Sequence, residues 1–131
     1  RLQGGEIFFL IGQLGAGKTC FVKGLAKGLG IKKTITSPTF TLLQTYISPD
    51  KQKCLVHSDF YRLRKKSEII DLGLTEFFNK KNIVCVEWAK KLGQIFPEIS
   101  AIEAKFIYNK EVNRSVVFRN LPDYLKKTLQ T

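Results

Sequence analysis

Residues 12–19, GQLGAGKT, have the types and spacing of a phosphate-binding loop. Gly12, Gly17, Lys18 and Thr19 fit the pattern G-x-x-x-x-G-K-[ST], with an apolar run before it and a helical pattern after it. The glycines let the backbone turn several N–H groups toward phosphate oxygens, and the following helix adds partial positive charge. Lys18 can reach the β- and γ-phosphates of a nucleotide, while the Thr19 hydroxyl can bind Mg²⁺. The sequence therefore predicts a nucleotide-binding site.

Two acidic residues at predicted strand ends could complete this site. Asp59 ends the run CLVHSD and Glu87 ends NIVCVE, where the carboxyl ends of parallel strands would face the nucleotide. P-loop enzymes need a carboxylate near Mg²⁺, so one acid could hold the metal and the other could orient the attacking water. A merely solvated carboxylate is the alternative for either residue taken singly.

Four further residues have two interpretations each. His57 is either a structural histidine or a proton carrier, and the sequence assigns it no partner. Trp88 either packs in the core or stacks on a base or a partner. Thr39 and Thr41 either bring a hydroxyl to Mg²⁺ or the γ-phosphate, as mobile switch loops do, or belong to a plain Ser-Pro turn.

The chain is strongly basic. Its 22 Lys and Arg against 11 Asp and Glu leave a net charge of +11. Such a field attracts polyanions, with RNA the first candidate, although a Lys-rich codon bias is the alternative. The basic run Arg62, Arg64, Lys65 and Lys66 could neutralise a phosphate, bind RNA or simply be solvated.

The strands that must position these residues are predicted from apolar patterning. Runs at 6–11, 53–62 and 82–88 read as strands, and a Ser-Pro loop within 34–48 leads into another. Residues 101–108 and 114–120 are predicted to form a hairpin.

Helices are predicted at 19–30, ending at Gly30, and at 67–80, where Gly73 leaves two short helices as an alternative. A short helix from Trp88 to before Pro97 and a terminal helix within 121–130 complete the set. Strands that alternate with helices predict an α/β fold: a P-loop-like sheet, parallel in its core, with antiparallel C-terminal strands at one side and helices flanking it.

The composition is that of an ordinary globular domain. The 131 residues suit a single P-loop ATPase domain over 1–131, and a chain that starts at Arg1 and contains no Met is expected to lack its N-terminus. No apolar run approaches the ~20 residues that a membrane span needs. The 3 cysteines show no C-x-x-C spacing, so neither a disulfide framework nor a zinc site is expected, and a reducing cytoplasm is predicted.

Four motifs in order are more specific than any one alone: GQLGAGKTCFVKGLAKGLG, SPTFTL, HSDFYRL and VEWAKKLG. Together they closely resemble the small P-loop ATPases of bacterial tRNA threonylcarbamoyladenosine biosynthesis, the TsaE or YjeE type, over residues 4–119. P-loop kinases share the first motif but not the other three.

The resemblance implies roles for matched residues. Thr19 and Glu87 would hold Mg²⁺, while Asp59 and Lys18 would act in hydrolysis. Ser37, Pro38 and Thr39 would form a switch-like segment. The residues implied to contact the nucleotide are Gly12, Leu14, Gly15, Ala16, Gly17, Lys18, Thr19, Cys20, Trp88 and Arg114.

The resemblance also implies a Mg²⁺-dependent ATPase, slow when alone, that drives a two-protein threonylcarbamoyltransferase complex acting on tRNA in the cytoplasm. The basic surface would contact tRNA or an acidic partner. A small-molecule P-loop kinase, with YRLRKK at 61–66 as its lid, is one alternative. A non-enzymatic RNA-binding module with a structural nucleotide is another.

Overall fold

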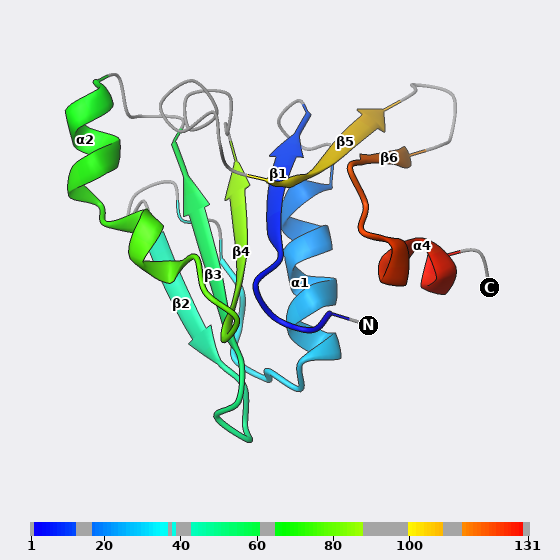
Figure 1. Ribbon diagram of the computed structural model, residues 1–131, viewed down its shortest axis with the longest axis horizontal. Coiled ribbons are helices and arrows are strands. Elements are labelled where there is room, and N and C mark those ends of the chain that lie inside the picture. The colour runs from blue at the N-terminus through cyan, green and yellow to red at the C-terminus, as the bar shows by residue number, and fades with distance from the viewer. Residues whose placement is uncertain are drawn as a thin grey trace.

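The computed structural model describes residues 2–12, 17–36, 38, 43–60, 65–87, 100–108 and 114–129. Within them, six strands form one sheet in the order β2-β3-β4-β1-β5-β6 (Figure 1). The strands are β1 Ile7–Ile11, β2 Leu43–Ile47, β3 Cys54–Asp59, β4 Asn82–Glu87, β5 Ile102–Tyr108 and β6 Arg114–Arg119. The helices are α1 Lys18–Gly28, α2 Lys66–Asp71 and α4 Asp123–Leu129, with a 3-10 helix, η1, at Leu74–Phe77.

The middle of the sheet is parallel and both edges are antiparallel. Strands β3, β4, β1 and β5 run parallel, while β2 pairs antiparallel with β3 and β6 antiparallel with β5. All residues of β3 and β4 are buried, as expected for strands covered on both faces. The predicted α/β fold class is confirmed. The antiparallel C-terminal strands are confirmed as well, and the sheet has a second antiparallel pair, β2 with β3, that the sequence did not predict.

The short connection between β2 and β3 explains this second antiparallel edge. Only residues 48–53 join the two strands, too few for the crossover that a parallel pair needs. The Ser48 hydroxyl donates to Asp50 Oδ1 at 2.6 Å, and the Lys53 backbone N–H donates to Ser48 Oγ at 3.1 Å. These contacts close the turn, so chain length and turn chemistry fix the direction of β2.

The two faces of the sheet carry separate apolar clusters. Figure 1 shows α1 alongside β1, on the opposite side of the sheet from η1. On the α1 face the buried residues include Phe8, Leu10, Val22, Ala26, Ile83 and Cys85. On the other face they include Val56, Phe60, Ile69, Leu74, Val84 and Val86.

Glycines end or divide the predicted helices. Gly73, at φ 68°, separates α2 from η1, which confirms the two-helix alternative for 67–80. Gly30, at φ 78°, follows α1, and the Ile31 N–H donates to Ala26 O at 2.9 Å as in a Schellman stop. The predicted helix after Trp88 lies outside the described residues. None of the described helices is long and apolar enough to cross a membrane.

The amino end of the sheet is tied to α4 through Glu6. This carboxylate is 5% exposed and accepts hydrogen bonds from the backbone N–H groups of Gln3 and Gly4, both at 2.7 Å. The Tyr124 hydroxyl donates to the same carboxylate. A buried charge is thereby satisfied by donors from both ends of the described chain.

Candidate functional site

The loop between β1 and α1 brings Gly12 and Lys18 together at the carboxyl edge of the sheet. Gly17 caps α1 at φ 107°, a conformation that glycine adopts without strain. Among the described residues no side chain caps this helix, and its first turn carries no acid, so its leading N–H groups can face an anion. Residues 13–16, including the predicted contacts Leu14, Gly15 and Ala16, lie outside the described residues.

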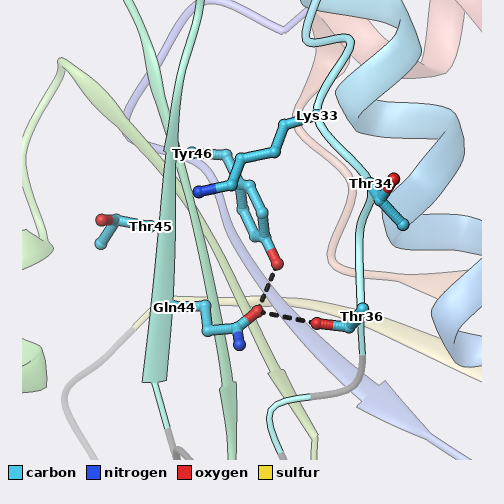
Figure 2. A pocket seen from close by; sticks show the side chains of 6 residues that line it. All are labelled: Lys33, Thr34, Thr36, Gln44, Thr45 and Tyr46. Atoms are coloured by element: carbon cyan, nitrogen blue, oxygen red, sulfur yellow. Dashed lines mark hydrogen bonds between the residues drawn. The ribbon is translucent and has the colours of Figure 1, made fainter.

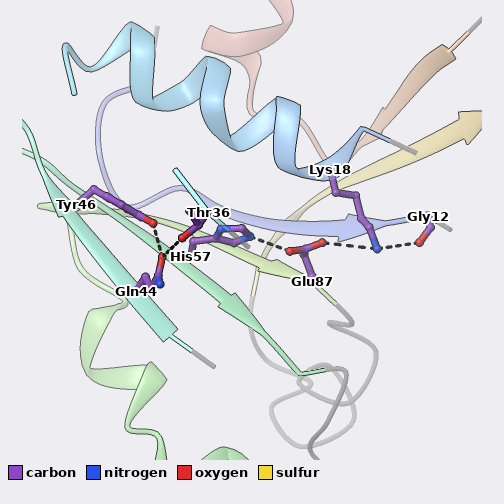
Figure 3. A network of polar contacts seen from close by, with 7 residues as sticks. All are labelled: Gly12, Lys18, Thr36, Gln44, Tyr46, His57 and Glu87. Carbon is purple, nitrogen blue, oxygen red and sulfur yellow. Dashed lines mark hydrogen bonds and ion pairs between the residues drawn. The ribbon is translucent and has the colours of Figure 1, made fainter. Parts of the chain in front are cut away.

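Lys18 is the first residue of α1 and turns its ammonium back toward β1. Its side chain is 6% exposed, and its Nζ donates to Gly12 O at 2.9 Å. The same Nζ lies 3.6 Å from Glu87 Oε1 (Figure 3). Lys18 and the acid that ends β4 therefore lie together, while the role of Lys18 on phosphate stays a prediction.

Asp59 and Glu87 end neighbouring parallel strands as direct register partners. Each is 5% exposed. Paired residues of adjacent strands point to the same face, and Cys85, two residues before Glu87, is in the α1-side cluster, so both carboxylates belong to that face. Glu87 therefore lies beside the N-terminus of α1, where Lys18 contacts it, and Asp59 is next to Glu87 in the sheet on the same face.

His57 is the partner of Glu87 that sequence reasoning missed. Its ring is fully buried, and Nε2 lies 2.9 Å from Glu87 Oε2. A signal for this pair was present: His57 precedes Asp59 by two residues, so both share the face onto which Glu87 also points. Once Asp59 and Glu87 are placed side by side in adjacent strands, His57 is the nearest residue of β3 on the same face, within reach of the Glu87 side chain.

The thiol of Cys85 is buried in the apolar cluster on the α1 face of the sheet. Burial raises the pKa of this thiol, and the negative charge of Glu87 raises it further. Cys85 is therefore a neutral packing residue beneath the site, and it is not a nucleophile.

A second polar cluster borders His57 from the edge strand. Gln44 is the register partner of His57, and its Oε1 accepts from Thr36 Oγ1 at 3.3 Å and from the Tyr46 hydroxyl. Gln44, Thr36 and Tyr46 line a cavity of about 220 Å³, whose other lining residues are Lys33, Thr34 and Thr45 (Figure 2). The cluster ties the segment that enters the predicted switch, residues 37–39, to β2.

Of the other predicted site residues, the structure describes Thr19, Cys20 and Pro38. Thr19 is partly buried, Cys20 is exposed and Pro38 is fully buried. Ser37, Thr39, Thr41 and Trp88 lie outside the described residues. Arg114 opens β6, the edge strand separated from β1 by β5, and its side chain is not described.

A strand, a loop with G-x-x-x-x-G-K-T, and a helix whose first lysine meets a strand-end acid define a nucleotide-binding protein of the P-loop type. Comparison with known proteins narrows this class. The family model described as "Threonylcarbamoyl adenosine biosynthesis protein TsaE" matches residues 1–116, so the chain belongs to the TsaE family.

Individual relatives agree with this assignment. The chain is similar to "tRNA threonylcarbamoyladenosine biosynthesis protein TsaE" of Treponema pallidum, at 44% identity over 74% of this chain and 70% of that protein. It is 45% identical to the Bacillus subtilis protein of the same name over 72% of this chain but 57% of that protein's length. The crystal structure of Bacillus subtilis YdiB superposes with a TM-score of 0.71, at 29% identity, covering 95% of this chain and 74% of that one.

Proposed function

We propose that this chain binds ATP with Mg²⁺ and hydrolyses it. The observation that carries the proposal is the contact between Lys18 and Glu87, made beside the open N-terminus of α1. A buried ammonium next to uncapped helix N–H groups suits the triphosphate of a nucleotide. Membership of the TsaE family supports the same kind of ligand.

On this proposal, separate groups of the chain would bind the phosphates, hold Mg²⁺ and orient the attacking water. Lys18 and the first turn of α1 would bind phosphate oxygens, with Gly12 and Gly17 shaping the loop. The Thr19 hydroxyl and the Glu87 carboxylate are hard oxygen donors of the kind Mg²⁺ prefers, and Asp59 would orient the attacking water. Mg²⁺, when bound, would neutralise charge on the β- and γ-phosphates.

The remaining predicted contacts complete the proposal. The backbone of Leu14, Gly15 and Ala16, together with Cys20, would line the phosphates. Trp88 would lie near the nucleotide and Arg114 is assigned to it through the family motif. Ser37, Pro38 and Thr39 would respond to the γ-phosphate, with the fully buried Pro38 as their anchor.

We further propose that hydrolysis drives a two-protein threonylcarbamoyltransferase complex that modifies tRNA in the cytoplasm. The names of the relatives, each a tRNA threonylcarbamoyladenosine biosynthesis protein, support this role. The net charge of +11 supports a polyanionic or acidic partner. On this proposal the protein is a slow ATPase alone, and its turnover depends on the assembly.

The test is steady-state phosphate release with and without the partner proteins and tRNA. We expect stimulation by the assembled partners, and loss of turnover in Lys18→Ala and Asp59→Asn. Equal turnover with and without partners would count against the biological role while leaving the ATPase intact. ATP carrying a labelled γ-phosphate distinguishes the hydrolase from the kinase alternative. A hydrolase releases all the label as free phosphate, whereas a kinase transfers it to an acceptor.

A further inference from the structure

We propose that His57 is a positioning residue for Glu87, and that their contact sets how strongly nucleotide binding depends on Mg²⁺. The inference deepens the proposed function and rests on it, since it concerns the carboxylate assigned to the metal. His57 itself is not proposed to touch nucleotide or metal.

The two oxygens of Glu87 have different partners. Oε2 lies 2.9 Å from His57 Nε2, and Oε1 lies 3.6 Å from Lys18 Nζ (Figure 3). An ionised carboxylate only accepts, so the proton of this hydrogen bond is on Nε2. The contact with His57 is the shorter of the two and has hydrogen-bond geometry, so it fixes the plane of the carboxylate and leaves Oε1 directed toward the loop.

The two partners also differ in freedom. Lys18 has a long, flexible stem and a second acceptor in Gly12 O, so its ammonium can exchange one oxygen for another. His57 is in the middle of β3, between β2 and β4, and is fully buried. When Lys18 turns toward phosphate, the bond from His57 has no reason to break, because it holds the opposite oxygen.

The second ring nitrogen supports a role directed at Glu87. Nδ1 of His57 is buried and finds no hydrogen-bond partner within the part of the chain that the structure describes. Histidines that serve only the packing of a core usually have their polar atoms satisfied. The ring instead makes its polar contact with Glu87, an arrangement typical of side chains that orient a metal-binding carboxylate.

Matched substitutions at His57 separate orientation from packing. The side-chain nitrogen of glutamine can reach the place of Nε2, whereas that of asparagine reaches only the place of Nδ1. We expect His57→Asn to lower the affinity for ATP in saturating Mg²⁺ by about 10- to 100-fold, the usual loss when the support of a metal ligand is removed. In EDTA the affinity should stay within about twofold of wild type, because the phosphate contacts are unchanged.

His57→Gln should recover most of the lost affinity in Mg²⁺. Affinities are measured by calorimetry at one pH, with thermal unfolding of each variant as the check on folding. The inference is overturned if the Asn and Gln variants bind equally well in Mg²⁺, or if both lose affinity equally in Mg²⁺ and in EDTA. If wild type itself shows no difference between Mg²⁺ and EDTA, the proposed metal site fails instead.

A spectroscopic measurement tests the geometry without any ligand. His57 is the only histidine in the sequence, so a tag-free, ¹⁵N-labelled protein gives one set of ring nitrogen signals. We expect a proton on Nε2 in wild type, and a changed signal in Glu87→Gln. A ring that carries its proton on Nδ1 and none on Nε2 would contradict the proposed contact.

Discussion

Two buried glutamates lie at opposite ends of the sheet and differ in what satisfies them. Glu6 and Glu87 are equally exposed, at 5% each. Glu6 accepts from two backbone N–H groups of its own loop and from the Tyr124 hydroxyl. Within the described part of the chain Glu87 contacts two side chains, His57 and Lys18, and Lys18 also donates to Gly12 O.

The difference lies in whether the partners can change. The donors at Gln3 and Gly4 are backbone groups whose positions are set by the loop itself, so Glu6 is part of the fold. Lys18 can exchange carboxylate for phosphate, so Glu87 can serve one arrangement before a ligand binds and another afterwards. Equal burial therefore does not imply equal partners: Glu6 is satisfied by backbone groups and a tyrosine, whereas the carboxylate that we propose as a metal ligand, Glu87, contacts a lysine and a histidine.

The largest expected effect separates the two glutamates by activity. Glu87→Gln keeps the shape but removes the charge, and should lower ATPase turnover at least about 100-fold, the scale of losing one preorganised charge-stabilising group. Glu6→Gln should leave turnover within about threefold, because Glu6 lies at the other end of the strands. Phosphate release at saturating ATP and Mg²⁺ measures both.

Equal losses of ATPase turnover in Glu87→Gln and Glu6→Gln would contradict the proposed difference between the two glutamates. Glu76→Gln, an exposed change on η1, is the control and should match wild type. Thermal unfolding of all three variants excludes loss of fold as the cause of inactivity.

The next largest effect concerns stability. Glu6→Gln and Tyr124→Phe each remove part of one hydrogen-bonded unit, and each should lower the free energy of unfolding by about 1–3 kcal/mol. Because the two residues share a bond, the double variant should lose less than the sum of the single losses. Urea unfolding of the four proteins measures the cycle, and strict additivity would show that the contact contributes nothing.

The α/β order and the placing of Asp59 and Glu87 at strand ends could be predicted because local patterns determine them, while the phosphate-binding role of the loop stays a prediction. Motif spacing and apolar runs that stop at an acid made Gly12, Lys18, Asp59 and Glu87 candidates, and the structure places all four at the carboxyl ends of strands or at the start of α1. The direction of β2 was missed, although the six-residue connection at 48–53 contains that information.

The partners of Glu6 and His57 could not be predicted from local pattern. Tyr124 is 118 positions from Glu6 and no short pattern links them, while His57, 30 positions from Glu87, becomes its neighbour only once Asp59 and Glu87 are placed side by side. Strand order alone brings β3 next to β4, and that order depends on the packing of the whole sheet. Long-range side-chain pairs therefore become visible only when register is known.

A smaller effect is the pH dependence at the Glu6 end. Burial acts to raise the pKa of Glu6, but hydrogen bonds from Tyr124, Gln3 and Gly4 outweigh it and leave the pKa below its ordinary value. A lowered folded-state pKa gives stability that is present above the unfolded pKa of roughly 4.3 and is lost as pH falls through the folded one. Urea unfolding between neutral pH and the acidic range should show this loss in wild type and less of it in Glu6→Gln. Identical slopes would show that Glu6 is not the group responsible.

The hydrogen bond between Tyr124 and Glu6 also affects the titration of Tyr124 at alkaline pH. Burial, followed by the hydrogen bond to Glu6 and its charge, raises the pKa of Tyr124 to about 12. The stability that this group contributes is present below the unfolded pKa of roughly 10 and is lost as pH rises through the folded one. Ultraviolet titration of the folded protein should show one late tyrosine that disappears in Tyr124→Phe. A late tyrosine that persists in this variant would assign the shift to another residue.

The smallest effect compares the thiols at the two ends of the molecule. Cys20 is exposed in the first turn of α1, whereas Cys54, at the start of β3, is buried and burial is the main cause of its raised pKa. A thiol reagent needs an accessible thiolate, so native protein should label at Cys20 and only slowly at Cys54. ATP with Mg²⁺ should slow the labelling of Cys20, while Cys20→Ser should change ATP affinity by less than about threefold, since a helix-start contact supplied mainly by backbone N–H groups tolerates the change. Mass spectrometry of labelled peptides identifies the site, and labelling of Cys20 at the same rate with and without ATP would place the nucleotide away from this end of α1.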